Sequence, residues 1–263
     1  MLENVKGFET SNAHQLLIST LRDCKYRIRE FLLSPDQFGV PNSRLRYYLL
    51  AIHQPEEFRD DEINEISTQI PVPMGNNSIF FDQHIEYKNK IQLKESSLEH
   101  YLENDENLDV QKFQLTDEQL LRYHKIIDIV DSRDPVTRTN CFTKSYGRRL
   151  EGCGSILKTS TQFSIEEIFT DIQKTSDPIT IIHSLHKLKL RLFTPKEIAN
   201  LMCFPHCLSM KENCPILSIN FFYVVEFPED FNIKQRYRLL GNSVNVLVCN
   251  YLLKILLGSQ WQQ

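Results

Sequence analysis

The stretch Lys234–Asn245, which reads K-Q-R-Y-R-L-L-G-N-S-V-N, constrains the fold more than any other part of the chain. Its residues Gly241–Ser243 form a turn sequence, because glycine permits positive φ and short polar side chains can bond nearby backbone or a ligand. Val244–Leu253 then carries apolar residues at helical spacing. We expect a polar, basic loop that opens a buried helix, whose N-terminus offers free N–H groups to a ligand. An ordinary loop with a helix cap fits the same residues.

Composition narrows the class of protein. The 263 residues suggest one or two domains of about 150 residues each. The formal charge of −4 argues against a globally basic nucleic-acid binder but allows a local basic groove. The seven scattered Cys indicate reduced thiols in an intracellular protein, in the cytoplasm and/or nucleus. No secretory signal opens the chain, and we find no apolar run long enough to span a bilayer.

The first part of the chain reads as one helix and two strands. Apolar spacing predicts a short amphipathic helix over His14–Cys24, and aromatic and apolar runs predict strands over Tyr26–Leu33 and Arg46–His53. Ser34–Arg44 contains turn residues and reads as a loop. This order fits the second half of a doubly wound α/β sheet. Glu3-Asn4-Val5 stands at the start with no strand expected before it.

The middle of the chain is more polar. Within 54–115, the segment Ile85–Glu106 fits either a solvated helix or a partly disordered insertion. Ser97–Leu102 and Gln114–Ile129 show helical spacing. Asp131–Ile156 is rich in basic, aromatic and turn residues, which suits phosphate contact and base stacking. A solvated loop is the alternative interpretation of that segment.

Towards the C-terminus, the sequence predicts another helix with a defined start. Phe163–Leu192 reads as helical or mixed, and Thr194-Pro195-Lys196-Glu197 is a capping box with Thr at the N-cap, Pro at N1 and Glu at N3. We expect that helix to cover Glu197–Met202 and to end near Pro205. The following segment, Cys207–Phe227, has an apolar stretch but no functional interpretation.

Several of these motifs, in this order, resemble the cytosine-5 methyltransferases. They are Glu3-Asn4-Val5, then Arg44-x-Arg46 before a strand, then Gly241-Asn242-Ser243-Val244 near the C-terminus. Cys141–Gly147 and Phe193–Leu201 look like the tRNA-directed branch of the DNA methyltransferase family. The resemblance covers most of the chain and departs at 207–227, where the family pattern passes directly from a Phe-Pro turn to the Lys-Gln-Arg segment.

The resemblance implies a fold and a division of the chain. The fold is α/β: the C-terminal part of the sheet of a Rossmann-like class I S-adenosylmethionine-dependent methyltransferase, with a smaller target-recognition region. Residues 1–53 would belong to the catalytic domain and 54–190 to the recognition region with its polar insertion. Residues 191–263 would return to the catalytic domain, interrupted by the atypical insertion 207–227.

The resemblance also implies site residues for methyl transfer to carbon 5 of a flipped cytosine. Glu3 would bond ring nitrogen 3 of the base and Asn4 would orient the site. Of Arg44 and Arg46, one would bond the base carbonyl or support the nucleophile, and the other would brace a carboxylate or a backbone phosphate. Asn242, Ser243 and Val244 would close over S-adenosylmethionine. The residues expected to bind tRNA are Arg138, Cys141, Phe142, Thr143, Lys144, Tyr146, Arg236 and Arg238.

Two parts of the family pattern are not found. The sequence has no Gly-rich loop between a strand and a helix of the type that cradles the cofactor, and none of its Cys follows a proline, the family's setting for the nucleophile. We therefore expect a truncated or alternatively started methyltransferase, with doubtful activity on its own. The alternative is an inactive fragment that acts at most as an RNA-binding or protein-binding module.

The expected partner is tRNA, with weaker binding of DNA and no membrane. Cys203, His206, Cys207 and Cys214 resemble a metal cluster in composition, but their spacing matches no common zinc pattern. We expect no metal.

Overall fold

The computed structural model describes residues 1–56, 58, 65–70, 97–103, 109–204 and 227–257. The chain divides into two compact units. Unit 1 combines Met1–Glu95 with Val244–Gln263, and unit 2 is Ser96–Ser243. The predicted insertion 207–227 lies outside the described residues except for Phe227, and Ile85–Glu106 is described only at 97–103.

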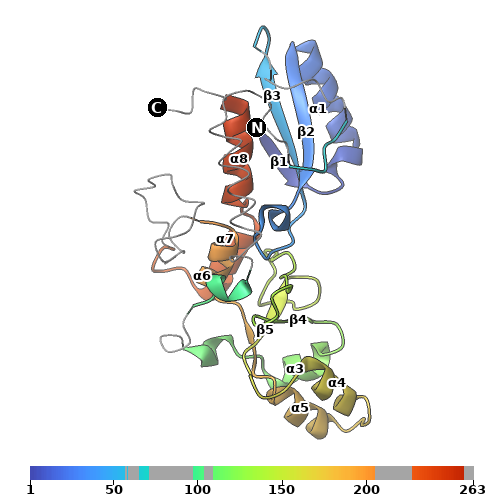
Figure 1. The fold of residues 1–263 in the computed structure, drawn as a ribbon, viewed down its shortest axis with the longest axis vertical. Coiled ribbons are helices and arrows are strands. Elements are labelled where there is room, and N and C mark those ends of the chain that lie inside the picture. Colours follow the sequence, from blue (N-terminus) through green and yellow to red (C-terminus); the bar gives the residue numbers. More distant parts are fainter. Residues whose placement is uncertain (57, 59–64, 71–96, 104–108, 205–226, 258–263) are drawn as a thin grey trace. The chain divides into compact units, whose positions relative to one another are not determined.

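Unit 1 is built on a three-stranded sheet of order β1-β3-β2 (Figure 1). The strands are β1 (Leu2–Val5), β2 (Tyr26–Leu33) and β3 (Arg46–His53), and β3 runs antiparallel to both neighbours. The bounds of β2 and β3 are those predicted from sequence. As expected, no strand precedes Glu3-Asn4-Val5 in the described residues; the motif itself lies on β1, where Glu3 and Asn4 pair with β3.

Helices cover both faces of this sheet (Figure 1). On one face α1 (Asn12–Asp23) packs its apolar side, including Ile18, on Tyr47 and Leu49. The alternation of a strand places Tyr48 on the opposite face, where α8 (Val246–Leu257) packs on β3. Unit 1 is therefore a helix–sheet–helix sandwich, which agrees with the predicted doubly wound class.

Unit 2 contains a second small sheet, of order β4-β5-β6. The pairing is parallel between β4 and β5 and antiparallel between β5 and β6. Gln114–Ile129, for which helical spacing was found, contains a helix and the start of a strand. Phe163–Leu192, interpreted as helical or mixed, is mixed. The elements of the unit are β4 (Asp128–Asp131), β5 (Ser155–Lys158), β6 (Leu190–Leu192), α3 (Asp117–Tyr123), α4 (Ile165–Ile172), α5 (Pro178–His186), α6 (Pro195–Leu201) and α7 (Ile233–Gly241), with short 3-10 segments η3 (Leu98–Tyr101) and η5 (Val110–Phe113).

The boundary between units differs from the boundary predicted at 191. Unit 2 extends to Ser243, because β6 completes the second sheet and α6 packs against both η3 and α7. Residues 191–243 thus fold with residues 96–190 in unit 2, and α8 alone of the described C-terminal helices belongs to unit 1.

The basic loop expected at Lys234–Gly241 is a helix. Asn232 accepts a hydrogen bond from Gln235 N in a capping box that starts α7, and the connection to α8 is only residues 242–245. Gly241 ends α7 and is not among the glycines with positive φ. The prediction that Gly241 adopts a turn conformation with positive φ is therefore wrong. Among the described helices, the stretch Ile233–Leu257 is long and apolar enough to cross a membrane by length and composition only, and the connection 242–245 divides it into α7 and α8.

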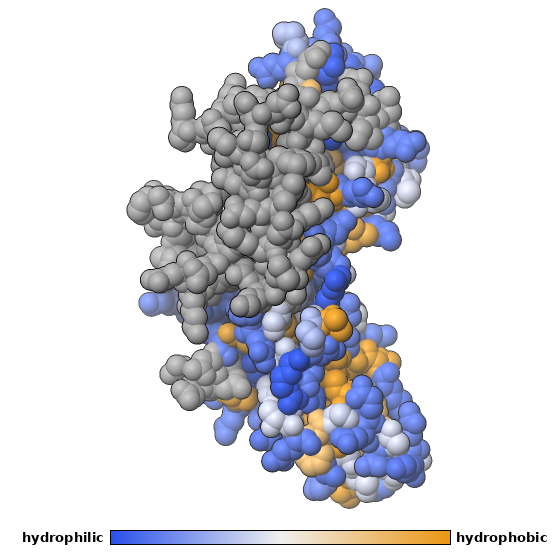
Figure 2. Space-filling model, viewed as in Figure 1, coloured by the Kyte–Doolittle hydropathy of each residue, from blue (hydrophilic) through white to orange (hydrophobic). Residues whose placement is uncertain are grey.

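Hydrophobic residues also reach the surface in patches between hydrophilic ones (Figure 2). Among the described residues, Val136 and Ile179 are each 78% exposed. Scattered exposed apolar side chains of this kind are normal for a folded surface.

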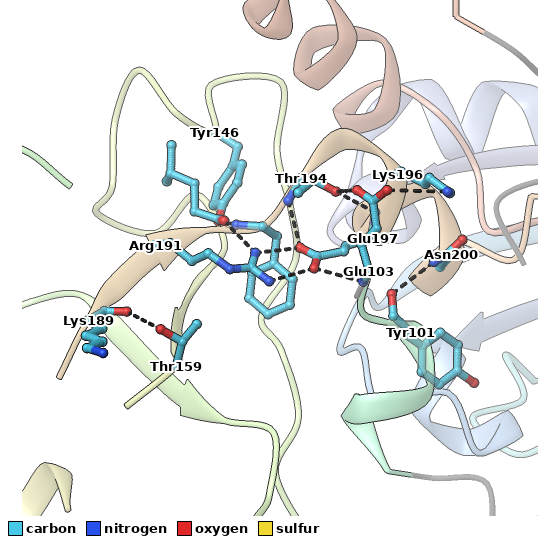
Figure 3. Close-up of polar contacts among 12 residues, drawn as sticks. Tyr101, Glu103, Tyr146, Thr159, Lys189, Arg191, Thr194, Lys196, Glu197 and Asn200 are labelled. Atoms are coloured by element: carbon cyan, nitrogen blue, oxygen red, sulfur yellow. Dashed lines mark hydrogen bonds and ion pairs between the residues drawn. The ribbon is translucent and has the colours of Figure 1, made fainter. Parts of the chain in front are cut away.

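A buried ion pair organises unit 2 (Figure 3). The guanidinium of Arg191, on β6, donates two hydrogen bonds of 2.8 Å to the carboxylate of Glu197, on α6, and both side chains are at most 1% exposed. The same carboxylate accepts from Thr194 N at 2.8 Å and from Glu103 N at 3.1 Å. One side chain therefore joins the strand, the start of α6 and the segment after η3.

Glu197→Gln should destabilise unit 2 strongly, because the charge of Arg191 would stay buried without its partner. Losing one member of a buried pair typically costs about 3–5 kcal/mol. The free energy of unfolding, measured by urea denaturation, would show the loss. The matched control is Asp171→Asn, which breaks an exposed pair with Lys174 and should change stability far less. Equal effects of the two substitutions would contradict the role given to Glu197.

Candidate active site and recognition loop

Two of the three charged residues expected to be catalytic, Glu3 and Arg46, meet on the α8 face of the unit 1 sheet. Glu3 pairs with Tyr48 across β1 and β3, and Arg46 is two residues before Tyr48, so all three side chains share that face. Arg46 Nε lies 3.3 Å from Glu3 Oε1, with the side chains 16% and 23% exposed. Arg46 is thus the arginine that braces a carboxylate, and the carboxylate keeps access to solvent.

Arg44 is placed differently from Arg46. It precedes β3, is 4% exposed, and its backbone N–H donates to Ser34 Oγ at 2.9 Å. The phenol of Tyr48 interacts with both arginines. Burial, followed by the charges of Cys249 and Glu3, raises the pKa of this phenol, whereas the positive charges of Arg44 and Arg46 lower it. The phenol therefore stays protonated beside the Glu3–Arg46 pair.

The side chain of Asn4 is bonded to the backbone at the end of its own strand, β1. Its side-chain oxygen accepts a hydrogen bond from Val5 N at 2.8 Å, immediately before the turn in which Gly7 has a φ of 99°. Asn4 pairs with Tyr47, so its side chain lies on the α1 face, opposite Glu3 and Arg46, and its role in orienting the site stays a prediction.

Cys249 is a buried thiol near this cluster. It lies on α8 and is 8% exposed, and burial, with a smaller contribution from the charge of Glu3, raises its pKa to about 11. A thiolate is the nucleophilic form of Cys. Cys249 is therefore protonated at neutral pH and is not an attacking group.

In unit 2 the recognition loop, residues 140–154, has its own aromatic core. The ring of Phe142 packs edge-on against Tyr146 and Phe193, with centroids 4.9 and 5.2 Å apart. Tyr146 packs in the same manner on Tyr237 of α7, at 5.0 Å. Phe142 and Tyr146 are each 2% exposed, so stacking on bases, which we expected of them, does not fit their burial. They hold the loop instead.

The phenol groups tie this core to the backbone. Tyr146 Oη donates to Ser155 O at 2.7 Å and accepts from Phe193 N at 2.9 Å, and Tyr237 Oη donates to Phe193 O at 2.6 Å. Burial raises the pKa of both phenols, so they remain hydrogen-bond donors over the whole neutral range.

The polar members of the predicted RNA surface lie at or near solvent. Arg138, Lys144 and Arg238 are exposed, and Cys141, Thr143 and Arg236 are half-buried. Arg236 Nε donates to Phe231 O at 2.9 Å, and its guanidinium lies 5.3 Å from the ring centre of Phe227, which fixes its direction. The structure thus separates the expected RNA residues into exposed basic groups and a buried aromatic support.

The residues expected to hold S-adenosylmethionine lie on the connection after α7. Asn242 is exposed, and Ser243 and Val244 are half-buried. The backbone N–H groups of Asn242 and Ser243 donate to carbonyls of α7, and Val248 N donates to the side chain of Asn245. Of the N–H groups at the start of α8 that were expected to be free for a ligand, that of Val248 is therefore used by a cap. The accessible amide and hydroxyl side chains still fit the polar part of the cofactor, as one portion of its site.

Comparison with known proteins assigns the family. A family model described as C-5 cytosine-specific DNA methylase matches residues 1–257. The chain belongs to this family. It is 37% identical to the tRNA (cytosine(38)-C(5))-methyltransferases of Bos taurus and Homo sapiens over 97% of its length. It also matches a crystal structure of a Spodoptera frugiperda DNMT2 mutant with a TM-score of 0.75, 34% identity and 97% coverage.

The chain is shorter than these relatives. It spans 70% of the length of the two mammalian enzymes and 65% of the insect chain. The mixed α/β architecture of a Rossmann-like methyltransferase is shared with them.

Three residues that surround the candidate site or support the loop of this C-5 methylase are not evident from the sequence. No sequence pattern marked Tyr48 or Cys249 as a site residue, and only the fold places them near Glu3. Tyr237 lies between Arg236 and Arg238, the two expected RNA-binding arginines of this stretch, and its burial was not predicted. The signal available for it was the capping box of Asn232 and Gln235, which predicts a helix and thus a buried face for Tyr237.

Cys249 should react slowly with iodoacetamide at neutral pH, because burial keeps the thiol protonated. Its pKa of about 11 lies above the usual range, so the thiolate appears only as the pH rises towards that value. Mass spectrometry of alkylated peptides would give the rate at each Cys. Exposed Cys24 serves as the reference, and alkylation of Cys249 as fast as Cys24 at neutral pH would show that the pKa is not raised.

Proposed function

We propose that this chain is part of an S-adenosylmethionine-dependent methyltransferase that methylates carbon 5 of cytosine in tRNA. The observation that carries the proposal is the Glu3–Arg46 pair, a braced and partly accessible carboxylate in a chain of the C-5 methylase family. The mammalian relatives named for tRNA supply the substrate class.

The chemistry requires a positioned carboxyl group. Carbon 5 of cytosine is a poor nucleophile, and the family activates it by adding a Cys thiolate to carbon 6. Glu3 would hydrogen-bond ring nitrogen 3 and stabilise the charge that develops there during this addition. Arg46 would hold the carboxyl of Glu3 in direction, and Arg44, buried before β3, would support the strand that carries Arg46.

The remaining residues would serve the cofactor and the RNA. Asn242, Ser243 and Val244 would hold part of S-adenosylmethionine, which supplies the methyl group when bound. Arg138, Lys144, Arg236 and Arg238 would contact phosphates, since basic side chains at or near the surface position nucleic acid without reading its sequence. Cys141 and Thr143 would contact RNA from the same loop, and Phe142 and Tyr146 would hold that loop from inside.

Glu3→Gln should lower the rate of methyl transfer by about 10²–10⁴-fold, the usual loss when an acid–base group is removed. The affinity for tRNA should not change, because the phosphate contacts lie elsewhere in the chain. Transfer of labelled methyl to unmodified tRNA would be measured in the 263-residue chain and in a chimera joined to the segment of the human relative that the chain does not match. Glu166→Gln, at an exposed position of α4, is the matched control.

The same assay separates the alternatives. Preference for DNA over tRNA would overturn the substrate class, and full activity of Glu3→Gln would overturn the role of the carboxyl. Binding of tRNA with no methyl transfer in either form would support a binding module in place of an enzyme.

A further inference from the structure

Gly241, the last residue of α7, lies directly against the backbone of the recognition loop. A Cβ atom built on Gly241 would overlap Lys144 N and Thr143 C and would lie 2.5 Å from Lys144 Cα. Such separations are not tolerated, and the neighbours here are backbone atoms, which cannot rotate away as a side chain can. No residue larger than glycine fits unless the peptide Thr143–Lys144 moves.

A second close approach joins the same two elements a few residues further along the loop. A Cβ atom on Gly147 would lie 2.8 Å from Cε2 and 2.9 Å from Cδ2 of Tyr237. Tyr237 is 2% exposed and its hydroxyl is bonded to Phe193 O, so its ring has little freedom to move. The loop therefore contacts α7 at two positions, Gly241 and Gly147, where there is no room for a Cβ atom.

The stretch between these points is internally tied. Tyr146 N donates to Thr143 O at 3.0 Å, and the N–H groups of Arg148 and Arg149 both donate to Ser145 O at 3.0 Å. Two overlapping turns thus connect Lys144 to Gly147. A displacement imposed at either contact would be passed on to the exposed side chain of Lys144.

We propose that Gly241 is a positioning residue that holds Lys144 in place for a contact with an RNA phosphate. This proposal rests on the proposed function, because it takes tRNA as the ligand. A lysine binds phosphate as a point charge, so the position of its backbone decides whether the ammonium group reaches the phosphate. Gly241 acts through its lack of a side chain and does not itself touch the RNA.

Salt dependence gives a readout that simple loss of stability would not change. The logarithm of the tRNA association constant falls linearly with the logarithm of salt concentration, and each lost phosphate contact lowers the slope by about one. A destabilised but otherwise normal protein binds less at every salt concentration and keeps its slope. The slope would be measured by fluorescence anisotropy with labelled tRNA and the full chain, well below the unfolding temperature.

Lys144→Ala, Gly241→Ala and the double variant should each lower the slope by about one. The double variant should be no worse than either single variant, because all three lose the same phosphate contact. Wild-type slope in folded Gly241→Ala, or an additive loss in the double variant, would overturn the proposal.

If Gly241→Ala does not fold, a second pair of glycine variants still tests the proposal. Gly147 and Gly152 belong to the same loop and have φ of +75° and +61°, but a Cβ on Gly152 meets nothing within 4 Å. Both alanine variants therefore carry similar backbone strain, and only Gly147→Ala presses on α7. We expect Gly147→Ala to lower the slope and Gly152→Ala to keep it. Equal slopes for these two variants would overturn the proposal.

The experiment also distinguishes this proposal from the proposed function. Failure of the wild-type chain to bind tRNA, or a full slope in Lys144→Ala, would count against the proposed RNA surface itself. A reduced slope in Lys144→Ala, together with a full slope in folded Gly241→Ala, would leave the RNA surface standing and remove only the positioning role of Gly241.

Discussion

The carboxylate of Glu197 is the interaction on which unit 2 depends. It accepts two hydrogen bonds from Arg191 and one each from the backbone of Thr194 and Glu103. A fully buried charge is costly unless its lone pairs are satisfied, so these four donors must be in place together. The second sheet, α6 and the segment after η3 are therefore assembled as one structure, against which the recognition loop and α7 can be held.

Unit 1 also contains an arginine–glutamate ion pair, but this pair has a different role. Arg46 and Glu3 are separated by 3.3 Å and are 16% and 23% exposed, whereas Arg191 and Glu197 are at most 1% exposed. An ion pair at this level of exposure contributes little to stability. Its value is geometric, since an arginine can fix the direction of a carboxyl group and still leave an oxygen free to meet a ligand.

The sequence predicts local structure well where the signal is local. The strands β2 and β3 follow from aromatic and apolar runs, and α6 follows from the capping box of Thr194 and Glu197, which the structure confirms. The prediction failed at α7, where a loop was inferred over residues 234–240 although the capping box at Asn232 indicated a helix; the predicted turn is confirmed only at Asn242 and Ser243, after that helix. The need for glycine at 241 comes from a loop about a hundred residues away, and no local pattern reports such a contact.

The burial of Phe142 and Tyr146 shows why composition alone misjudged the recognition loop. Aromatic and basic residues that alternate in a loop suggest a surface that both stacks on bases and binds phosphates. A loop of this length has no regular backbone ladder to hold it, so its aromatic side chains are needed as an internal core against Phe193 and Tyr237. The charged residues are left outside as a consequence. The net charge of −4 is therefore compatible with RNA binding, because what matters is that the loop core fixes a few positive groups in space.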